Sequence, residues 1–317
     1  MLELVLPWVI VGLFVLFVLS LLKKWWRFAL FCLVIMVGIN LLTQSFAFHF
    51  RGSRETVAEL ADSIPPQALK VLTFNIDGSQ LGDDQVRQMR DFILAQHADV
   101  VLLVECFGNG PKLLHEALAD EFSHSSYGIV SREQRLYSKY PIEAATRIEP
   151  KAFKGANNYR YDISAFGTTL HLYGVHFMSN NRGVDGKDYS TPDDIEDMEQ
   201  FKGYLRKISH ASSQRRLESA AIADDIRALS GGLRIVMGDF NDVCGSATLR
   251  QLQLAGMRDA WWRGGLGYGA TYRKLPFRID HILYSKRLKL KDVARLRTRL
   301  SDHNALSATF ILDNSVK

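Results

Sequence analysis

The hydrophobic pattern divides the chain into an apolar leading segment and a longer segment of mixed character. Residues 4–22 carry no charge, residues 23–27 are basic and aromatic, and residues 28–48 are again free of charge. Each uncharged run is long enough for a helix to cross the roughly 30 Å apolar core of a bilayer. The pattern therefore predicts a two-helix transmembrane hairpin within residues 1–50, with spans at about 4–22 and 28–48.

A cleaved signal peptide is the alternative interpretation of the first apolar run. It would require a basic N-terminal region and a shorter apolar core, whereas this chain begins Met1-Leu2-Glu3 and a second apolar run follows at once. Basic residues at 23, 24 and 27 favour a cytoplasmic position for the short loop between the two spans, although Arg51 and Arg54 act in the opposite sense. We expect the rest of the chain to lie outside the cytoplasm.

Residues 51–68 are polar and end in Pro65-Pro66, which predicts a linker before a domain at 69–317. Short apolar runs with polar ends predict strands at Lys70–Phe74, Val100–Val104, Thr169–Val175, Arg234–Met237, Ile279–Tyr284 and Ala305–Leu312. Apolar positions at helical spacing predict helices at Asp84–Gln96, Pro111–Ala119 and about Ser212–Leu229. Such alternation indicates a layered α/β (α+β) domain. Residues 179–213 are polar and show no regular pattern, which is typical of a functional or disordered loop.

The amino-acid composition excludes few classes of ligand or substrate. The net charge is 39 − 34 = +5 with a pI near 9.0, which is compatible with nucleic acid, phospholipid head groups or phosphate esters as partners. Three cysteines and the lack of any Cys/His cluster argue against a structural zinc site. A disulfide between Cys106 and Cys244 stays open at this level.

Polar residues recur where the predicted strands end. The segment 235–245 ends its strand with Asp239 and Asn241, and the first strand of the domain ends with Asn75 and Asp77 at the same spacing. Residues two apart in an extended chain point to the same face. An Asx turn that closes a strand would explain any one of these pairs. The other strand ends contribute Glu105, His176, Asp280, Asp302 and His303.

Ionised acids gathered at one edge of a sheet repel each other unless a cation or a bound proton compensates them. Carboxylate and amide oxygens are the ligands that Mg²⁺ or Mn²⁺ prefers, and such a site leaves room for a phosphate oxygen. A histidine oriented by an aspartate can contact the phosphate or transfer a proton. The pattern therefore favours attack of water on a phosphate ester.

The motifs TFNID, LVE, GVHFMSNNR, GDFND, RIDHIL and SDHNAL, in this order, resemble the endonuclease/exonuclease/phosphatase superfamily, which includes deoxyribonuclease-I-like enzymes. The resemblance covers about residues 69–312. It implies a four-layer α/β sandwich of two packed mixed sheets flanked by helices, here preceded by the hairpin. Together with the predicted hairpin, it suggests a membrane-anchored bacterial member, multi-pass in the inner membrane, with its catalytic domain on the periplasmic or extracellular side.

The resemblance implies roles for particular residues. Glu105 and Asn75 look like metal ligands for Mg²⁺ or Mn²⁺, with Asp77 and Asp302 beside them. Asp239 resembles the acid that aligns or deprotonates water, and Asp280 the partner that orients a histidine. Contacts with the phosphate or the rest of the substrate would come from His303, His176, Asn241 and Arg182.

The resemblance leaves the substrate open. The segment 183–213 matches no signature of a nuclease or a sphingomyelinase, and Val104 replaces the glutamine that usually precedes the metal-binding glutamate. We expect a phosphodiester substrate, either nucleic acid or a phospholipid head group, contact with the lipid bilayer through the hairpin, and no protein partner. A membrane-anchored module that binds a phosphorylated ligand without catalysis is the alternative function.

Overall fold

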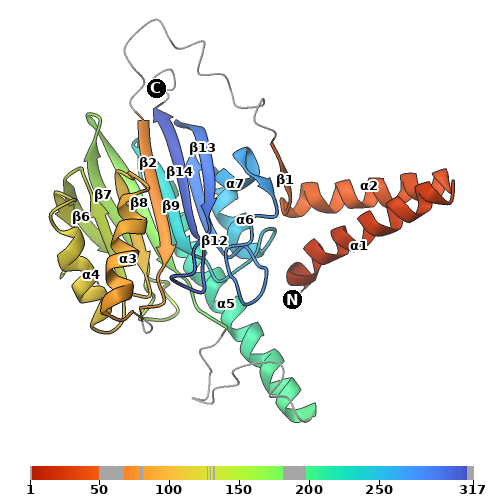
Figure 1. The fold of residues 1–317 in the computed structure, drawn as a ribbon, viewed down its shortest axis with the longest axis horizontal. Helices are drawn as coiled ribbons and strands as arrows, with labels where there is room; N and C mark the ends of the chain where they lie inside the picture. Colours follow the sequence, from red (N-terminus) through yellow and green to blue (C-terminus); the bar gives the residue numbers. More distant parts are fainter. Residues whose placement is uncertain are drawn as a thin grey trace, which may run out of the picture.

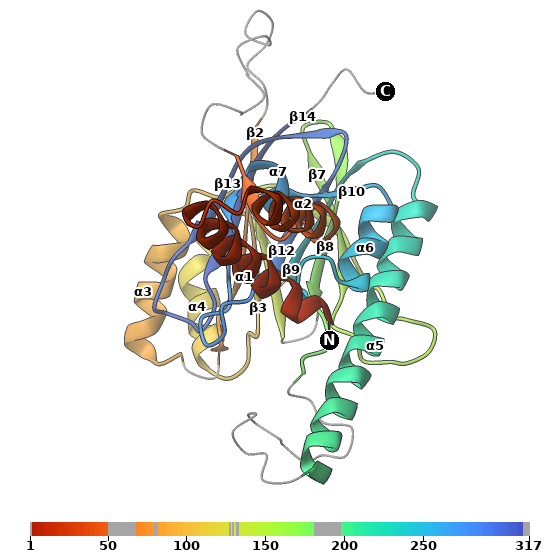
Figure 2. The same ribbon diagram turned by 90° about the vertical axis from the view of Figure 1, so that its right-hand side faces the viewer.

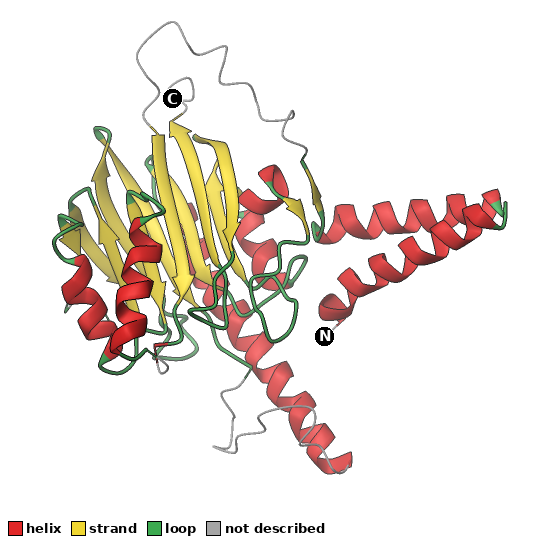
Figure 3. Cartoon of the chain, in the orientation of Figure 1, coloured by secondary structure: helices red, strands yellow, loops and turns green. Residues whose placement is uncertain are grey.

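The computed structural model describes residues 2–49, 68–78, 81–126, 128, 130, 133–180 and 198–312. Two six-stranded sheets pack face to face, and helices flank the pair on both outer sides (Figures 1 and 3). This arrangement confirms the predicted four-layer sandwich. The apolar hairpin projects from one side of the sandwich, and Figure 2 looks along it toward the domain.

The first sheet has the strand order β13-β14-β2-β3-β5-β4. Its strands are β2 (Ala68–Asn75), β3 (Val100–Val104), β4 (His124–Ser125), β5 (Gln134–Ser138), β13 (Leu288–Leu296) and β14 (Ala305–Leu312). Strands β2 and β3 are parallel, and the other neighbours are antiparallel. The sheet is therefore mixed, as the resemblance implied.

The second sheet has the order β10-β12-β9-β8-β7-β6, with β8 and β9 parallel. Its strands are β6 (Ile142–Arg147), β7 (Tyr159–Ala165), β8 (Thr168–His176), β9 (Leu233–Asp239), β10 (Met257–Asp259) and β12 (Asp280–Ser285). Because the parallel pairs β2/β3 and β8/β9 are central in their sheets, their polar carboxyl ends are brought into the middle of the domain.

Helices cover the outer faces of the two sheets. One apolar core lies between the first sheet and α3 (Asp83–Leu94) and α4 (Gly110–Leu118). A second core lies under α5 (Met198–Ala228) and α6 (Ala247–Leu254), and the short α7 (Ala260–Gly264) packs near β12 and β13. The largest core fills the space between the sheets.

Side-chain alternation decides which polar residues face the seam between the sheets. In β9, Ile235 and Met237 belong to the core between the sheets while Val236 faces the helices, so Asp239 lies on the inner face. The same alternation places the residues at the ends of β2 and β8, Asn75 and His176, on the inner faces of their strands. The polar strand ends therefore meet at one edge of the central seam.

The region expected to be irregular, 179–213, is partly helical. Helix α5 starts at Met198 and runs for 31 residues, so it begins fourteen positions before the predicted start at Ser212. Ile208 and Ala211 in this early part are buried, and with Leu205 they repeat at helical spacing. This apolar stripe could have predicted the earlier helix start, but the many charged residues around it made the helical pattern hard to recognise.

The hairpin helices are α1 (Leu2–Leu22) and α2 (Trp26–Thr43), which pack side by side (Figures 1 and 2). Both are long and apolar enough to cross a membrane, a criterion that a signal sequence also meets. The predicted span at 28–48 is too long, because α2 ends at Thr43. Gln44 adopts the left-handed conformation there, and the Asn40 side chain bonds both the N–H and the C=O of Phe46.

The chain joins the α/β sandwich directly after α2, before the predicted linker. Strand β1 (Ala47–Phe48) pairs with β11 (Leu266–Gly267), and the His49 ring lies 2.8 Å from the Trp262 carbonyl oxygen. The Phe46 and Tyr268 rings also pack together. Residues 44–49 are therefore structurally part of the domain that we expected to begin at residue 69, and the predicted linker at 51–68 lies almost entirely outside the described residues.

A buried ion pair reinforces this junction. Arg278 is fully buried and bonds both carboxylate oxygens of Asp259, at 3.0 and 2.8 Å, while it also donates to the Gln44 carbonyl oxygen. Gly245 has a φ of +81°, and a Cβ atom at this position would lie 2.9 Å from the Thr43 Cα, so a side chain there would collide with the end of α2. The cysteines at 32, 106 and 244 are free and buried, so the Cys106–Cys244 bridge does not form.

Candidate active site

Three polar residues lie in one row across neighbouring strands of the second sheet. In the β8–β9 register His176 lies beside Asp239, and in the β9–β12 register Asp239 lies directly opposite Asp280. All three are buried, at 8%, 1% and 1% exposure. The strand register therefore places the Asp239 and Asp280 carboxylates next to each other, away from solvent. Two buried negative charges at this distance are unfavourable unless other groups compensate them.

Asn75 connects this row to the opposite sheet. Its Nδ2 donates to Asp239 Oδ2 at 3.0 Å, so the ends of β2 and β9 are bonded across the seam. The other Asp239 oxygen, Oδ1, accepts the backbone N–H of Asn241 at 2.8 Å. The Asn241 side chain donates in turn to the Phe177 carbonyl oxygen. Asp239 is thus held in one orientation by groups from both sheets.

His303 compensates the two aspartates. Its Nδ1 lies 2.8 Å from Asp280 Oδ2, and its Nε2 lies 3.9 Å from Asp239 Oδ2. The backbone N–H of His303 donates to the Ser301 hydroxyl, which donates to the Asn75 carbonyl oxygen. The loop that carries the histidine is therefore fastened to the end of β2, and the imidazole is fixed between two carboxylates.

Glu105 reaches the same place by a different route. Val104 faces the seam, so a regular extended continuation would turn Glu105 toward the helices. Instead, Glu105 has a φ of +60°, and its Oε1 lies 3.5 Å from His176 Nε2. Asp77 and Asn241 also have positive φ. Such backbone strain in non-glycine residues gathers at functional sites, where the surrounding contacts maintain it.

Charge interactions shift the pKa values of the Asp239–His303 pair. Burial, and then repulsion from Asp280, raise the pKa of Asp239 to about 6. Burial would lower the pKa of His303, but the charge of Asp280 and the hydrogen bond to it outweigh this effect and raise the pKa to about 10. His303 is therefore an imidazolium at neutral pH, and Asp239 titrates close to neutral pH.

Glu105 and His176 form a second pair. Burial would raise the pKa of Glu105, but interactions with His176, with smaller ones from Asn75 and His303, lower the pKa to about 2. Burial would lower the pKa of His176, yet its contacts with Glu105 and Asp239 raise that pKa. Glu105 is consequently a carboxylate throughout the physiological range, and with 29% of its side chain exposed it is open to solvent.

Two overlapping groups of side chains in the described part of the chain are close enough to hold a cation. Glu105, His176 and Asp239 form one, and Asp239, Asp280 and His303 form the other, with ligand atoms within 4.8 Å of one another. Asp280 Oδ1 is buried and makes no hydrogen bond among the described residues. Together the two groups supply three carboxylates and two histidines. Protonated His303 has no lone pair to offer, so the donors that remain are mainly carboxylate oxygens, which fit a hard divalent ion such as Mg²⁺ or Mn²⁺.

The remaining predicted residues lie at the rim or outside the described chain. Asp77 and Asp302 line an adjoining open hollow of about 370 Å³, and Asp302 Oδ2 lies 2.8 Å from Lys274 Nζ. The two cation-capable groups contain neither of them. Arg182 lies outside the described residues.

Two further residues support the site, although neither was among the predicted site residues. The Thr271 hydroxyl accepts the backbone N–H groups of Ile279 and Asp280, and thereby positions the start of β12. The Tyr272 ring packs against the His303 ring at 5.1 Å between centroids. Both belong to the segment 267–272, whose glycines and Thr-Tyr pair were the only available signal.

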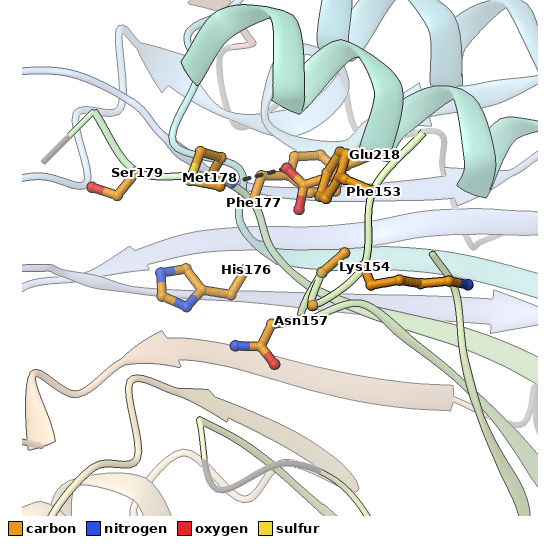
Figure 4. A pocket seen from close by; sticks show the side chains of 10 residues that line it. Phe153, Lys154, Asn157, His176, Phe177, Met178, Ser179 and Glu218 are labelled. Atoms are coloured by element: carbon orange, nitrogen blue, oxygen red, sulfur yellow. Dashed lines mark hydrogen bonds between the residues drawn. The ribbon is translucent and has the colours of Figure 1, made fainter. Parts of the chain in front are cut away.

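Glu218 is a further buried acid beside the site. It accepts the Met178 N–H at 2.9 Å and lines a cavity of about 60 Å³ with His176, Phe177 and Asn157 (Figure 4). No sequence motif marked it, because it lies in the middle of α5 among ordinary helix residues. Burial raises the pKa of Glu218 to about 7.

A buried seam of two mixed sheets that ends in acids, amides and paired histidines defines a hydrolase of phosphoester bonds. The model of the Endonuclease/Exonuclease/phosphatase family matches residues 72–303, and the chain belongs to this family, whose members are divalent-metal-dependent phosphoesterases and nucleases. It is therefore an enzyme that hydrolyses phosphoric ester bonds. No curated protein matches the sequence.

Solved structures share the fold at low sequence identity. Humanized TDP2 from D. rerio aligns with a TM-score of 0.56 and 16% identity over 77% of this chain and 98% of its own. The 3′ phosphatase NExo from Neisseria, bound to a product DNA hairpin, aligns at 0.55 and 17% over 76% and 99%. Beta toxin from Staphylococcus aureus aligns at 0.51 and 17% over 76% and 99%.

The raised pKa of Glu218 predicts a change of stability with pH. The folded protein binds this proton more tightly than the unfolded chain, so its contribution is complete below about pH 4.5 and is lost as pH rises toward 7. Glu218→Gln removes this loss. The free energy of unfolding of the variant, relative to the parent, should rise on the order of 2–3 kcal/mol between these pH values.

Denaturant melts in detergent micelles at several pH values measure this difference. Glu143→Gln, at an exposed position, is the control and should follow the parent. Parallel stability curves for Glu218→Gln and the parent would show that Glu218 is ionised in the folded protein over this range.

Proposed function

We propose that this protein is a membrane-anchored phosphodiesterase that uses a divalent metal ion and water to cleave a phosphodiester bond. The observation that supports this most strongly is the hydrogen-bonded chain Asn75–Asp239 together with Asp280–His303 at the mouth of the seam. It combines a carboxylate with a near-neutral pKa and a permanent imidazolium within 3.9 Å. Those are complementary groups for activating water and for binding a phosphate.

Glu105 and Asn75 are the residues that would hold Mg²⁺ or Mn²⁺ in this proposal, with Asp77 and Asp302 contacting it or its waters. Glu105 suits this role because its carboxylate is ionised at every relevant pH and is partly open to solvent. A bound ion would neutralise phosphate charge and polarise the phosphoryl group. Manganese and magnesium both accept such oxygen ligands.

Asp239 is the proposed proton acceptor for the attacking water. Its pKa of about 6 leaves it mostly ionised at neutral pH yet basic enough to take a proton. Protonated His303, held by Asp280, would donate to a phosphate oxygen and stabilise the charge that develops there. His176 and Asn241 would donate from the other side of the mouth. Arg182 keeps the substrate-contact role implied by the resemblance.

Metal dependence is the first test of this assignment. Excess EDTA should abolish hydrolysis of bis-p-nitrophenyl phosphate, and Mg²⁺ or Mn²⁺ should restore it. Glu105→Gln keeps the shape but removes the charge, so the metal concentration for half-maximal rate should rise about tenfold or more. Full activity in EDTA would contradict a metal-dependent reaction, and an unchanged metal requirement in Glu105→Gln would remove Glu105 from the ligand set.

The proton-transfer roles predict large losses of rate with a preserved fold. Asp239→Asn and His303→Ala should each lower kcat about 10²–10⁴-fold on the same substrate, because each removes a group that acts in the transition state. Asp224→Asn and His210→Ala, at exposed positions on α5, are matched controls. Near-parental kcat in either site variant would contradict the role given to that residue.

A basic hollow beside the site favours a nucleic acid strand over a lipid head group. Arg273, Arg295, Arg297 and Arg299 line an open hollow of about 520 Å³, and Arg273 and Arg299 also border the hollow that contains Asp77 and Asp302. No carboxylate in the described chain pairs with the three arginines on β13 and its following loop. Burial and then the charge of Arg297 lower the pKa of Arg295.

Such uncompensated arginines fit a second phosphate next to the one that is hydrolysed. Tyr272 packs on His303 and immediately precedes Arg273 of this hollow, and its ring offers a surface on which a base can stack. A phospholipid with a single phosphate would leave the hollow unused. The repeating phosphates of nucleic acid would fill both positions.

Paired substitution of Arg297 and Arg299 by Gln tests this substrate. KM for an oligonucleotide should rise roughly tenfold with a weaker salt dependence, because phosphate contacts are lost. Hydrolysis of bis-p-nitrophenyl phosphate, which is too short to reach the arginines, should be unchanged. Arg227→Gln, a surface residue of α5, is the control. A loss confined to phosphoinositide vesicles would instead identify a lipid substrate, and equal losses on all substrates would contradict the subsite.

We also propose that α1 and α2 form the membrane anchor, with the catalytic domain on the periplasmic or extracellular side. The length and apolar composition of both helices support the anchor. The basic residues Lys23 and Lys24 between the helices support the orientation. We propose a division into anchor, linker at 51–68 and catalytic domain at 69–317, in which residues 44–49 move from the anchor at 1–50 to the catalytic unit.

A further inference from the structure

The face of the catalytic domain next to the hairpin has an unusual surface. Helices α6 and α7 and strand β1 form the side from which the hairpin projects (Figure 1). Outside the hairpin, the described chain exposes six large aliphatic or aromatic side chains: Phe48, Leu113, Leu217, Leu254, Leu266 and Leu275. Three of these six, at 48, 254 and 266, lie at this face.

The three exposed apolar residues are tied to the end of α2. Phe48 and Leu266 are direct partners across the β1–β11 pair, with 63% and 60% exposure. Leu254, with 76% exposure, follows Gln253, whose amide donates to the Gln44 side chain at 3.0 Å. They therefore lie close to the point where the hairpin leaves the domain. Single exposed leucines are common on soluble proteins, but such a gathering marks an interaction surface.

The charge of this part of the chain is one-sided. Residues 245–277 contain one acid, Asp259, which is buried and neutralised by Arg278. The same range carries Arg250, Arg258 and Arg263, all of them exposed. Its other two basic residues, Arg273 and Lys274, border the hollow beside the active site. Arg250 is on α6 and Arg263 is on α7, the two helices of the hairpin side. Basic side chains next to exposed apolar ones complement the phosphates and acyl chains of an anionic membrane surface.

The junction fixes this face relative to the hairpin. The end of α2 is held to the domain by three features: the β1–β11 pairing, the hydrogen bond from Arg278 to Gln44 and the close packing of Gly245 against Thr43. Helix α2 is therefore not connected to the domain by a flexible segment. If the helices cross a bilayer, the side of the domain that they leave is therefore held against the lipid head groups.

We propose that the face formed by α6, α7 and the β1–β11 pair rests on the surface of an anionic bilayer. Phe48, Leu254 and Leu266 enter the head-group layer, and Arg250 and Arg263 contact lipid phosphates. This proposal depends on the proposed anchor and is independent of the catalytic assignment. Because the strands run crosswise to the hairpin in Figure 1, the active-site edge then opens along the membrane surface and does not face into it.

Site-directed spin labelling of the full-length protein tests the proposal. The three native cysteines are buried, so a single new surface cysteine can be labelled selectively. Leu254→Cys and Leu266→Cys are the probes, and Leu113→Cys on α4 and Leu217→Cys on α5 are matched controls that are also exposed leucines. The labelled proteins are placed in nanodiscs that contain phosphatidylglycerol. Relaxation of each label by oxygen is compared with relaxation by a water-soluble nickel chelate.

If residues 254 and 266 enter the head-group layer, oxygen should relax the labels at these positions more strongly than the nickel chelate does. The nickel chelate should be the stronger relaxing agent at 113 and 217. Arg250→Glu with Arg263→Glu, or discs of phosphatidylcholine alone, should shift the two probes toward the control behaviour. Retained hydrolysis of bis-p-nitrophenyl phosphate and an unchanged melting curve establish that the labelled proteins are folded.

Probes at 254 and 266 that are as accessible to nickel as the controls would overturn the proposal. Dipolar broadening between labels would also overturn it, because a second copy of the chain would then cover this face. Neither result would bear on the metal and proton-transfer assignments, which are measured by hydrolysis.

Discussion

The active-site edge depends on how two buried carboxylates are kept side by side. Asp239 and Asp280 are direct partners on antiparallel strands, and both are almost fully buried. Two ionised acids in that position repel each other strongly in a poorly solvated environment. His303 lies between them and carries the compensating positive charge, while Asn75 donates to the same Asp239 oxygen from the opposite sheet. The repulsion is thus balanced by groups that only the closed sandwich supplies.

This balance joins the fold to the chemistry. The loop with His303 is fastened to the end of β2 through the Ser301 hydroxyl, and the start of β12 is fastened through Thr271. Movement of either sheet relative to the other would separate the imidazolium from its carboxylates and expose the repulsion. The same contacts that hold the seam closed therefore keep Asp239 at a pKa near neutrality, which is the property that its proposed role requires.

The junction between the apolar hairpin and the α/β domain also depends on a buried charge pair. The hairpin is continuous with the catalytic domain through residues 44–49, which supply an edge strand and an acceptor for the buried Arg278. Arg278 would be a costly buried charge without Asp259, and together they fix the segment that leads into Asp280. One buried cluster thus determines both how the domain sits on the hairpin and where β12 starts. Such a connection gives the domain a defined orientation relative to the hairpin, in contrast to a domain on a flexible tether.

The sequence by itself determined where most strands and helices lie, because the period of the hydrophobic residues indicates them. It also determined which polar residues lie at the strand ends. The strands at 100–104 and 305–312 were predicted to the residue. The sequence also marks Asn75, Glu105, Asp239, Asp280 and His303 as candidates, because each lies where an apolar run starts or ends. Residue order also carried the family resemblance, since the motifs are local.

Only the tertiary structure decided what lies next to what. Local patterns do not reveal that Glu105 turns toward His176 through a left-handed backbone, or that Glu218 is buried from the middle of a helix. The basic hollow brings together residues 273 and 295–299, which are separated along the chain and show no dense charge run. The second helix was predicted to end at residue 48, whereas it ends at Thr43. Residues 44–48 are uncharged, and an uncharged segment is equally compatible with the interior of a membrane and with a buried junction in a protein. The hydrophobic pattern of a sequence indicates which residues are buried. It does not indicate which residues they contact, because those contacts are determined by the packing of segments that are distant in the sequence.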